Sequence, residues 1–175
     1  MNFSVTDTLT HRQLREVKRL YRRAFPKEER KPFSVILKLR KAGKCDILHF
    51  SSGKEFLGLA ITVKGDGLVL VDYFAVEEGK RGSGIGSAMM REVLQRYTGM
   101  GVFLEIEEPK GDGGVTDRRL SFYKRAGYSE LSVSVKLFGV DMILLGVECS
   151  LCFEDYRAFS CENIGRFAYN HIKKN

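Results

Sequence analysis

A short glycine-rich stretch is the first place in this sequence where the residue types predict chemistry. It reads Arg-Gly-Ser-Gly-Ile-Gly-Ser over Arg81–Ser87, between an apolar run (Leu68–Val76) and an amphipathic run that continues to Leu94. Glycines between a strand and a helix let the backbone close around an anion, and the N–H groups and dipole of the helix start favour negative charge. The arginine adds charge-assisted hydrogen bonds. The stretch therefore predicts a pyrophosphate-binding loop.

Two glutamates form the second chemical feature. Glu105 and Glu107 belong to the apolar run Val102–Glu107, and the period of two in a strand places both carboxylates on one face. Carboxylates that are packed close together raise each other's proton affinity, which suits a general base. The alternative is a pair of salt bridges to Arg118 or Arg119, because ion-pair networks also gather charge.

The spacing of the glycines separates this loop from two other anion-binding loops. No stretch offers the P-loop pattern, and the dinucleotide pattern G-x-G-x-x-G fails because Ser87 stands where the third glycine belongs. The pattern that fits is R-x-x-G-x-G, formed by Arg81, Gly84 and Gly86. Further along, Arg118–Tyr128 has a short helical pattern, a glycine placed to end it, and an aromatic residue that restarts a strand.

These two motifs resemble the GNAT superfamily of N-acetyltransferases over roughly Leu57 to Phe138. R-x-x-G-x-G is similar to its coenzyme A signature, and F-Y-x-x-x-G-Y is similar to its second motif. The resemblance implies an α+β fold: a mixed, mostly antiparallel central sheet of about six to seven strands, flanked by about four helices. In that fold the splayed central strands form the acetyl-CoA cleft. It also implies direct acetyl transfer from acetyl-CoA to a primary amine in a ternary complex, on a small molecule, a peptide or a protein.

The resemblance assigns roles to individual residues. Glu105 matches the glutamate that acts as a base in some members, including the ribosomal-protein N-terminal acetyltransferases, and Glu107 is the second choice. Tyr123 matches the tyrosine near the thioester sulfur, where it donates a proton to the leaving thiolate; its alternative role is to pack against the cofactor. Thr116 stands where many members carry an asparagine. The predicted cofactor-binding residues are Phe74, Ala75, Val76, Arg81, Gly82, Ser83, Gly84, Ile85, Gly86, Ser87, Thr116 and Tyr123.

The N-terminal region predicts the acceptor side. Thr10–Gln13 has the pattern of a capping box, so we expect a first helix to about Phe25 and a second over Phe33–Lys41. In many GNAT proteins the connection between these helices walls the acceptor site, so the resemblance marks its residues as substrate contacts. The alternative is a solvated helix connection. The predicted substrate-binding residues are Glu28, Glu29 and Arg30.

Size and composition predict one globular domain. The chain has 175 residues, of which 43% are hydrophobic and 29% charged, and such a chain buries an ordinary core. We expect a single domain over residues 1–175, with its core at about 45–150, an N-terminal helical region at about 8–43 and a C-terminal helical tail at about 153–175. Without a leader or a membrane-length apolar run, a cytoplasmic monomer or homodimer with no membrane partner is expected.

The cysteines and the basic charge have alternatives of their own. Cys149 and Cys152 form C-x-x-C, and Cys161 and His171 follow, which are ligand types that suit zinc. Because only one C-x-x-C pair is present, and Met142–Cys149 reads as a strand that ends at Cys149, we predict structural cysteines and no metal. The net charge of +7 is concentrated near the N-terminus. It suits nucleic acid, but aromatic residues are not interleaved with the basic ones, so a solvated helix face is predicted and a nucleic-acid partner is not.

Two other functions compete with acetyl transfer. A non-catalytic acyl-CoA sensor or interaction module would keep the glycine loop without turnover, and the presence of Tyr123 and the two glutamates argues against it. A nucleic-acid-binding protein would use the basic N-terminal helix, with an affinity that falls steeply with salt. Substitution of Arg81 separates these functions, because it weakens coenzyme A binding and leaves nucleic-acid binding largely intact.

Overall fold

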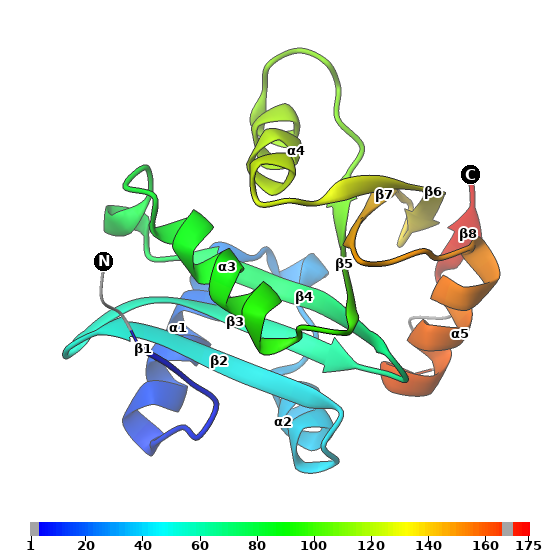
Figure 1. Cartoon of the computed structure of the whole chain (residues 1–175). Helices are drawn as coiled ribbons and strands as arrows, with labels where there is room; N and C mark the ends of the chain where they lie inside the picture. Colours follow the sequence, from blue (N-terminus) through cyan, green and yellow to red (C-terminus); the bar gives the residue numbers. More distant parts are fainter. Residues whose placement is uncertain (1–3, 166–169) are drawn as a thin grey trace. The chain divides into compact units, whose positions relative to one another are not determined.

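The computed structural model describes residues 4–165 and 170–175 (Figure 1). The helices are α1 (His11–Ala24), α2 (Phe33–Lys41), α3 (Ile85–Arg96), α4 (Val115–Arg125) and α5 (Phe153–Asn163), with 3-10 turns η1 (Lys27–Glu29) and η2 (Glu78–Lys80). The strands are β1 (Ser4–Thr6), β2 (Cys45–Ser52), β3 (Glu55–Lys64), β4 (Leu68–Val76), β5 (Gly101–Glu107), β6 (Ser129–Leu137), β7 (Val140–Val147) and β8 (Ile172–Lys174). The predicted α+β class is confirmed.

The strands pair as a mixed, mostly antiparallel sheet. β4 and β5 are parallel, whereas β1–β2, β5–β7, β6–β7 and β6–β8 are antiparallel. The described residues hold eight strands and five α-helices, slightly more than predicted. None of the helices in the described ranges has the length and apolar content that a membrane crossing needs.

The structure corrects two details near the C-terminus. The predicted helical tail ends in strand β8, because Ile172 is buried in the core while the two lysines that follow are exposed. The four residues 166–169 of that tail lie outside the described residues. Cys149 was expected at the end of a strand, but β7 already ends at Val147 and Glu148 takes a left-handed conformation with φ of 49°.

The chain forms two compact units. The first comprises residues 1–62 and 72–96, and the second comprises residues 63–71 and 97–175. β3 and β4 therefore contribute to both. The strand order is β1-β2-β3-β4 in the first unit and β4-β5-β7-β6-β8 in the second.

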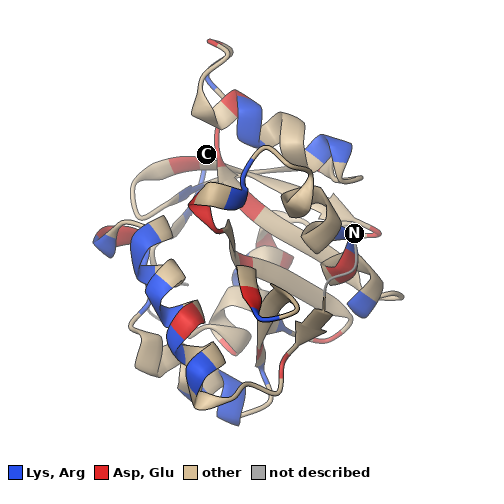
Figure 2. Cartoon of the chain, turned by 90° about the vertical axis from the view of Figure 1, so that its left-hand side faces the viewer, with Lys and Arg blue, Asp and Glu red and all other residues tan. Residues whose placement is uncertain are grey.

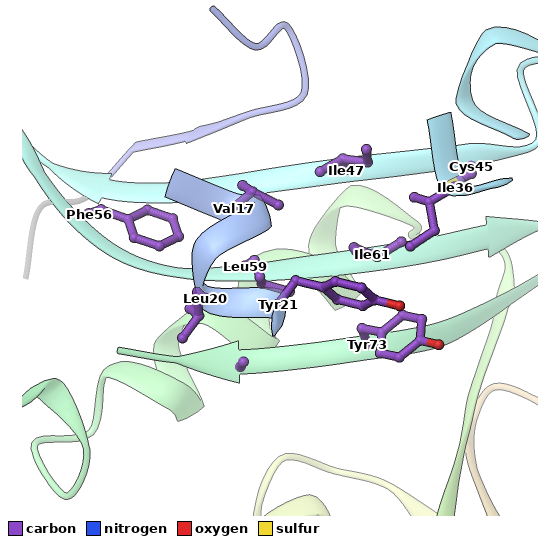
Figure 3. Close-up of a cluster of buried hydrophobic side chains, with 11 residues drawn as sticks. Val17, Leu20, Tyr21, Ile36, Cys45, Ile47, Phe56, Leu59, Ile61 and Tyr73 are labelled. Atoms are coloured by element: carbon purple, nitrogen blue, oxygen red, sulfur yellow. The ribbon is translucent and has the colours of Figure 1, made fainter. Parts of the chain in front are cut away.

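In the first unit, α1 forms where the capping box predicts it. The Thr10 side chain accepts a hydrogen bond from the Gln13 backbone N–H (3.3 Å), and the Gln13 side chain accepts one from the Thr10 N–H (2.9 Å). Pro26 follows directly after the cap at Phe25. The apolar stripe of α1 is buried against residues of α2, β2, β3 and β4, in the cluster shown in Figure 3.

Helix α3 packs on the opposite face of these strands (Figure 1). Leu59 and Ile61 of β3 belong to the cluster with α1, so alternation along this part of the strand turns the positions beside them the other way. Gly58 is such a position. A Cβ added there would lie 2.6 Å from Cε of Met89 on α3 and against the carbonyl oxygen of Ala75. The missing side chain therefore permits β4 and α3 to approach β3 closely.

Gly58→Ala is expected to lower the free energy of unfolding by about 1–3 kcal/mol, because overpacking forces backbone and side chains to shift. Denaturant unfolding measures the change. Gly79→Ala is the matched control, since Gly79 lies on η2 with no heavy atom within 4 Å of an added Cβ and no positive φ. Equal losses in the two variants would contradict the close approach as the cause.

In the second unit, α5 covers one face of β5. Phe103 of β5 is fully buried and lies edge-on to Phe159, with ring centroids 5.0 Å apart at 78°. Leu144 and Val135 of the neighbouring strands join the same cluster. This face is the one that also carries positions 105 and 107, because they follow Phe103 at intervals of two.

Candidate functional site

The predicted pyrophosphate loop forms a turn that opens α3. Gly82 and Gly84 have φ angles of 77° and 80°, which L side chains rarely adopt, and an added Cβ at either would meet no atom within 4 Å. The Ser83 hydroxyl donates to the Lys80 carbonyl (2.8 Å). Helix α3 starts at Ile85, so the N–H groups of its first turn have no acceptor within the helix. An open turn, strained for other residues and ending in free donors, fits an anionic group.

Arg81 stands beside this turn with an exposed side chain. Its Nε donates a long hydrogen bond to the Val76 carbonyl (3.4 Å), so the arginine is brought to the end of β4. Of the three predicted main-chain contacts there, Ala75 is buried, whereas Phe74 and Val76 are partly buried. The first unit therefore brings the end of β4, Arg81 and the glycine turn together.

The connection between α1 and α2 is fastened to β4. Lys31 Nζ lies 2.6 and 2.7 Å from the two carboxylate oxygens of Asp72, whose side chain is 8% exposed. The Tyr73 hydroxyl accepts from the Lys31 N–H and donates to the Glu29 carbonyl, both at 3.0 Å. The Tyr21 hydroxyl donates to the Lys31 carbonyl (2.9 Å). Burial, with Tyr73 beside it, raises the pKa of Tyr21 above its ordinary value, so the phenol stays a donor.

These bonds hold the backbone of the predicted acceptor segment and leave its acidic side chains outside. Glu28 and Glu29 are exposed on η1, and Arg30 is partly buried. A guanidinium nitrogen of Arg30 donates to the Arg22 carbonyl (3.1 Å). The roles of Glu28, Glu29 and Arg30 toward a substrate remain predictions.

Asp72→Asn is expected to cost about 1–3 kcal/mol of unfolding free energy, because it leaves the Lys31 ammonium without its carboxylate, while the partial exposure of Lys31 reduces the penalty. Asp141→Asn is the control. It breaks the exposed pair with Lys136 (2.7 Å) and should cost below about 1 kcal/mol. Chemical denaturation compares the two, and an equal, small loss in both would show that the Asp72 pair contributes little.

In the second unit, the two glutamates lie on β5 as predicted. Glu105 pairs with Leu144 and Glu107 with Met142 in the β5–β7 ladder, and both side chains are partly buried. The Tyr156 hydroxyl on α5 donates to Oε1 of Glu105 over 2.6 Å. Tyr156 was not among the site residues predicted from the sequence. The spacing of Tyr156, Phe159 and Asn163 indicates a buried helix stripe, but no local pattern names the partner of the phenol.

Helix α4 carries the other two predicted residues. Thr116 is buried in its first turn, and Tyr123 is partly buried two turns later. Burial raises the pKa of Tyr123 to about 12, with the nearby positive charge of Arg119 acting in the opposite direction. The phenol therefore keeps its proton at neutral pH. Its ring packs edge-on to Phe122 and Tyr128, and within the described ranges its hydroxyl has no hydrogen-bond partner.

The loop before α4 is organised by Asp117. Its carboxylate oxygens accept from the backbone N–H groups of Gly111 (3.1 Å) and Gly113 (2.8 Å). The bond from Gly111 is the main reason that the pKa of Asp117 lies below its ordinary value. The Arg118 guanidinium donates to the Gly113 carbonyl (3.2 Å). Side chains from the first turn of α4 thus hold the backbone of this loop.

The cysteines do not assemble a metal site in the described parts of the chain. No three His, Cys, Asp or Glu side chains group there as a metal ion requires. Cys45 is buried, Cys149 and Cys161 are partly buried and Cys152 is exposed. Cys152 caps α5 together with Asp155, and His171 stacks on Phe138. The structure gives these residues packing and capping contacts.

The basic residues of the N-terminus follow one another along α1 (Figure 2). Acidic side chains partly neutralise them. Arg12 pairs with Glu16 (3.1 Å), and Arg19 (3.8 Å) and Arg23 pair with Glu77 at the end of β4. Ion pairs within the first unit therefore neutralise part of the positive charge of α1, and such exposed pairs contribute little to stability.

Comparison with known sequences identifies the family. Residues 14–128 match the sequence profile described as the Acetyltransferase (GNAT) family, which is more than half of the chain. The chain belongs to this family. The predicted GNAT resemblance is thereby confirmed, and acetyl-CoA is the standard cofactor of the family.

Individual relatives are more distant. The protein named "Putative acetyltransferase YjbC" of Bacillus subtilis (strain 168) is 31% identical over 101 residues, which are 58% of this chain and 50% of that protein. The chain thus matches about half the length of this curated relative. A GNAT-family structure from Bacteroides thetaiotaomicron has a TM-score of 0.75 at 19% identity, covering 90% of this chain and 93% of the other.

A solved structure with bound ligands is also similar to this chain. Spermidine N-acetyltransferase from Vibrio cholerae, in complex with CoA and spermine, has a TM-score of 0.67 at 11% identity and covers 83% of this chain and 94% of its own. At such identities the likeness of both structures shows a shared fold. The GNAT fold predicted from the sequence is confirmed.

Proposed function

We propose that this GNAT protein is an N-acetyltransferase that moves an acetyl group from acetyl-CoA to a primary amine by direct transfer. The single observation that carries the proposal is the open turn with Gly82 and Gly84 in left-handed conformations at the start of α3, within a chain of this family. Such a turn presents backbone donors to an anion, and the pyrophosphate of coenzyme A is one. The bound cofactor would supply the acetyl group as a reactive thioester.

The residues of the first unit would bind. Arg81 would pair with phosphate oxygens, the first-turn N–H groups of α3 would hold the pyrophosphate, and the main chain of Phe74–Val76 would pair with an extended arm as an added strand does. Gly82–Ser87 shape the turn. The fit is supported by the open space at Gly82 and Gly84, where a side chain would find no neighbours but would be strained.

The residues of the second unit would move protons. The Glu105 carboxylate would accept a proton from the acceptor ammonium, so that the free amine can attack, with Glu107 as the alternative. Tyr123 would give its phenolic proton to the departing thiolate, and Thr116 would contact the cofactor. The protonated state of Tyr123 supports its role, because its pKa of about 12 keeps the proton available.

The acceptor is proposed as an amine whose class is open between small molecules and peptide or protein amino groups. The spermidine enzyme shares the fold of this chain, which supports including polyamines in a test. The exposed carboxylates of Glu28 and Glu29 on η1 would suit a cationic acceptor, because an ammonium favours nearby negative charge. A matched panel of polyamines, lysine-containing peptides and peptide N-termini covers these classes.

Glu105→Gln is expected to lower kcat by about 10²- to 10⁴-fold, the usual contribution of a positioned base. Thiol release from acetyl-CoA, measured across the acceptor panel, checks it. Glu107→Gln is the matched control on the same strand face and should lose below about tenfold. Calorimetry should find coenzyme A affinity within about twofold of the parent in both. The reverse order of the two losses would move the base to Glu107.

Tyr123→Phe is expected to lower kcat by about ten- to a hundredfold. This loss should be similar at every pH from about 7 to 10, because the raised pKa keeps the native phenol protonated throughout this window. The pH dependence of kcat for parent and variant checks this. A native rate that falls between these pH values, with the fall missing in Tyr123→Phe, would contradict the raised pKa, and an unchanged kcat in Tyr123→Phe would contradict the role of Tyr123 as proton donor.

Arg81→Ala is expected to weaken coenzyme A binding by about ten- to a hundredfold, since it removes charge-assisted bonds to phosphate. Binding is measured by calorimetry, beside salt-dependent binding to a nucleic-acid duplex as a control. Tight acetyl-CoA binding with no thiol release from any acceptor would favour a non-catalytic sensor. Duplex binding that falls steeply with salt and is unchanged in Arg81→Ala, without coenzyme A binding in either protein, would favour the nucleic-acid function.

A further inference from the structure

The C-terminal helix α5 carries a buried phenol that reaches the predicted base. Tyr156 is 1% exposed, and its hydroxyl donates to Oε1 of Glu105 over 2.6 Å. This length is typical of a charge-assisted bond from a hydroxyl to a carboxylate. A buried tyrosine hydroxyl needs a partner, and here that partner is a carboxylate 51 positions earlier in the chain.

Packing and capping hold the phenol in place. The Tyr156 ring lies edge-on to Phe103, with centroids 6.3 Å apart at 85°, and Phe103 precedes Glu105 by two residues on the same strand face. The Tyr156 N–H donates to the Cys152 carbonyl (3.1 Å) in the first turn of α5. The Ser160 hydroxyl donates to the Tyr156 carbonyl (2.9 Å). The helix thus sets where the hydroxyl lies.

The two glutamates of β5 differ in this contact. Within residues 4–165 and 170–175, the Glu107 carboxylate makes no hydrogen bond or ion pair, whereas Glu105 accepts the phenol. A donor on a carboxylate favours its ionised form and restricts its rotation. A base must be ionised before it can accept a proton, and it must hold one orientation. Glu105 meets both requirements through Tyr156.

We propose that Tyr156 is a positioning residue that holds the Glu105 carboxylate ionised and in one orientation for proton transfer. The proposal rests on the proposed acetyl transfer with Glu105 as base. Tyr156 lies beyond residues 14–128, the part that matches the family profile, so this contact is an addition to the matched pattern. It gives the C-terminal helix a part in the chemistry.

Tyr156→Phe keeps the ring against Phe103 and removes only the hydroxyl. We expect the Glu105 carboxyl to titrate about half to one pH unit higher in this variant, because the ionised form loses a donor. Carbon-13 NMR of labelled glutamate in the free protein, assigned with Glu105→Gln, measures the midpoint. With a competent acceptor, the acidic limb of kcat/KM should move the same way, and kcat should fall about tenfold.

Ser160→Ala is the matched control, because it removes another buried hydrogen bond of α5 and leaves the phenol in place. It should leave the Glu105 midpoint and the acidic limb unchanged. In a Glu105→Gln background, Tyr156→Phe should change kcat less than twofold, since the two residues act as one unit. Calorimetry should find coenzyme A affinity within about twofold of the parent in every variant.

The outcomes separate the two proposals. An unchanged Glu105 midpoint in Tyr156→Phe, or a shift equal to that of Ser160→Ala, would overturn the positioning role whether or not an acceptor is known. A shifted midpoint supports it even if no acceptor in the panel is acetylated. The absence of thiol release from every acceptor would count against the proposed acetyl transfer, and full activity of Glu105→Gln would overturn the base assignment on which Tyr156 depends.

Discussion

A buried charge in the middle of strand β4 constrains the path of the chain in the first unit. The Asp72 carboxylate is almost fully covered, and a covered charge must be paired and hydrogen-bonded to be tolerated. Lys31 supplies the pairing with both carboxylate oxygens, and the neighbouring Tyr73 holds the backbone on either side of Arg30. The path of the chain between α1 and α2 follows from this requirement.

The aromatic cluster of the first unit depends on the same contacts. Tyr21 and Tyr73 lie edge-on with centroids 4.8 Å apart (Figure 3). Both hydroxyls form hydrogen bonds with the backbone of Lys31. The rings bury apolar surface while the hydroxyls satisfy backbone groups that a loop would otherwise leave to water. The positions predicted to contact the cofactor through their main chain, Phe74–Val76, follow Tyr73 directly. Strand β4 therefore carries both Asp72 and Tyr73, which hold the connection between α1 and α2, and the predicted cofactor contacts.

The second unit solves a similar problem with a different partner. Glu105 also projects from a strand into covered surroundings, and there the Tyr156 phenol donates a hydrogen bond to one of its carboxylate oxygens. An ammonium neutralises a carboxylate and favours a structural role, whereas a phenol leaves the charge in place and orders it. The Lys31 pair fits a structural role for Asp72, and the Tyr156 contact fits the chemical role proposed for Glu105. In the same unit, Tyr123 lies on α4 with its proton retained by burial, which would suit a proton donor.

Short-range patterns in the sequence determined much of the fold and the nature of the site. The capping box at Thr10, the strands before the glycine turn, and the placement of Glu105 and Glu107 on one face depend on neighbours within a few residues, so the sequence was sufficient to predict them. The fold class and family followed from two motifs of this kind. Only the tertiary structure decided three contacts. Lys31 forms an ion pair with Asp72, Ala75 and Met89 approach Gly58 closely, and Tyr156 donates a hydrogen bond to Glu105. These partners are far apart in sequence, and their meeting depends on how packed strands and helices bring distant side chains together, which local propensity does not encode.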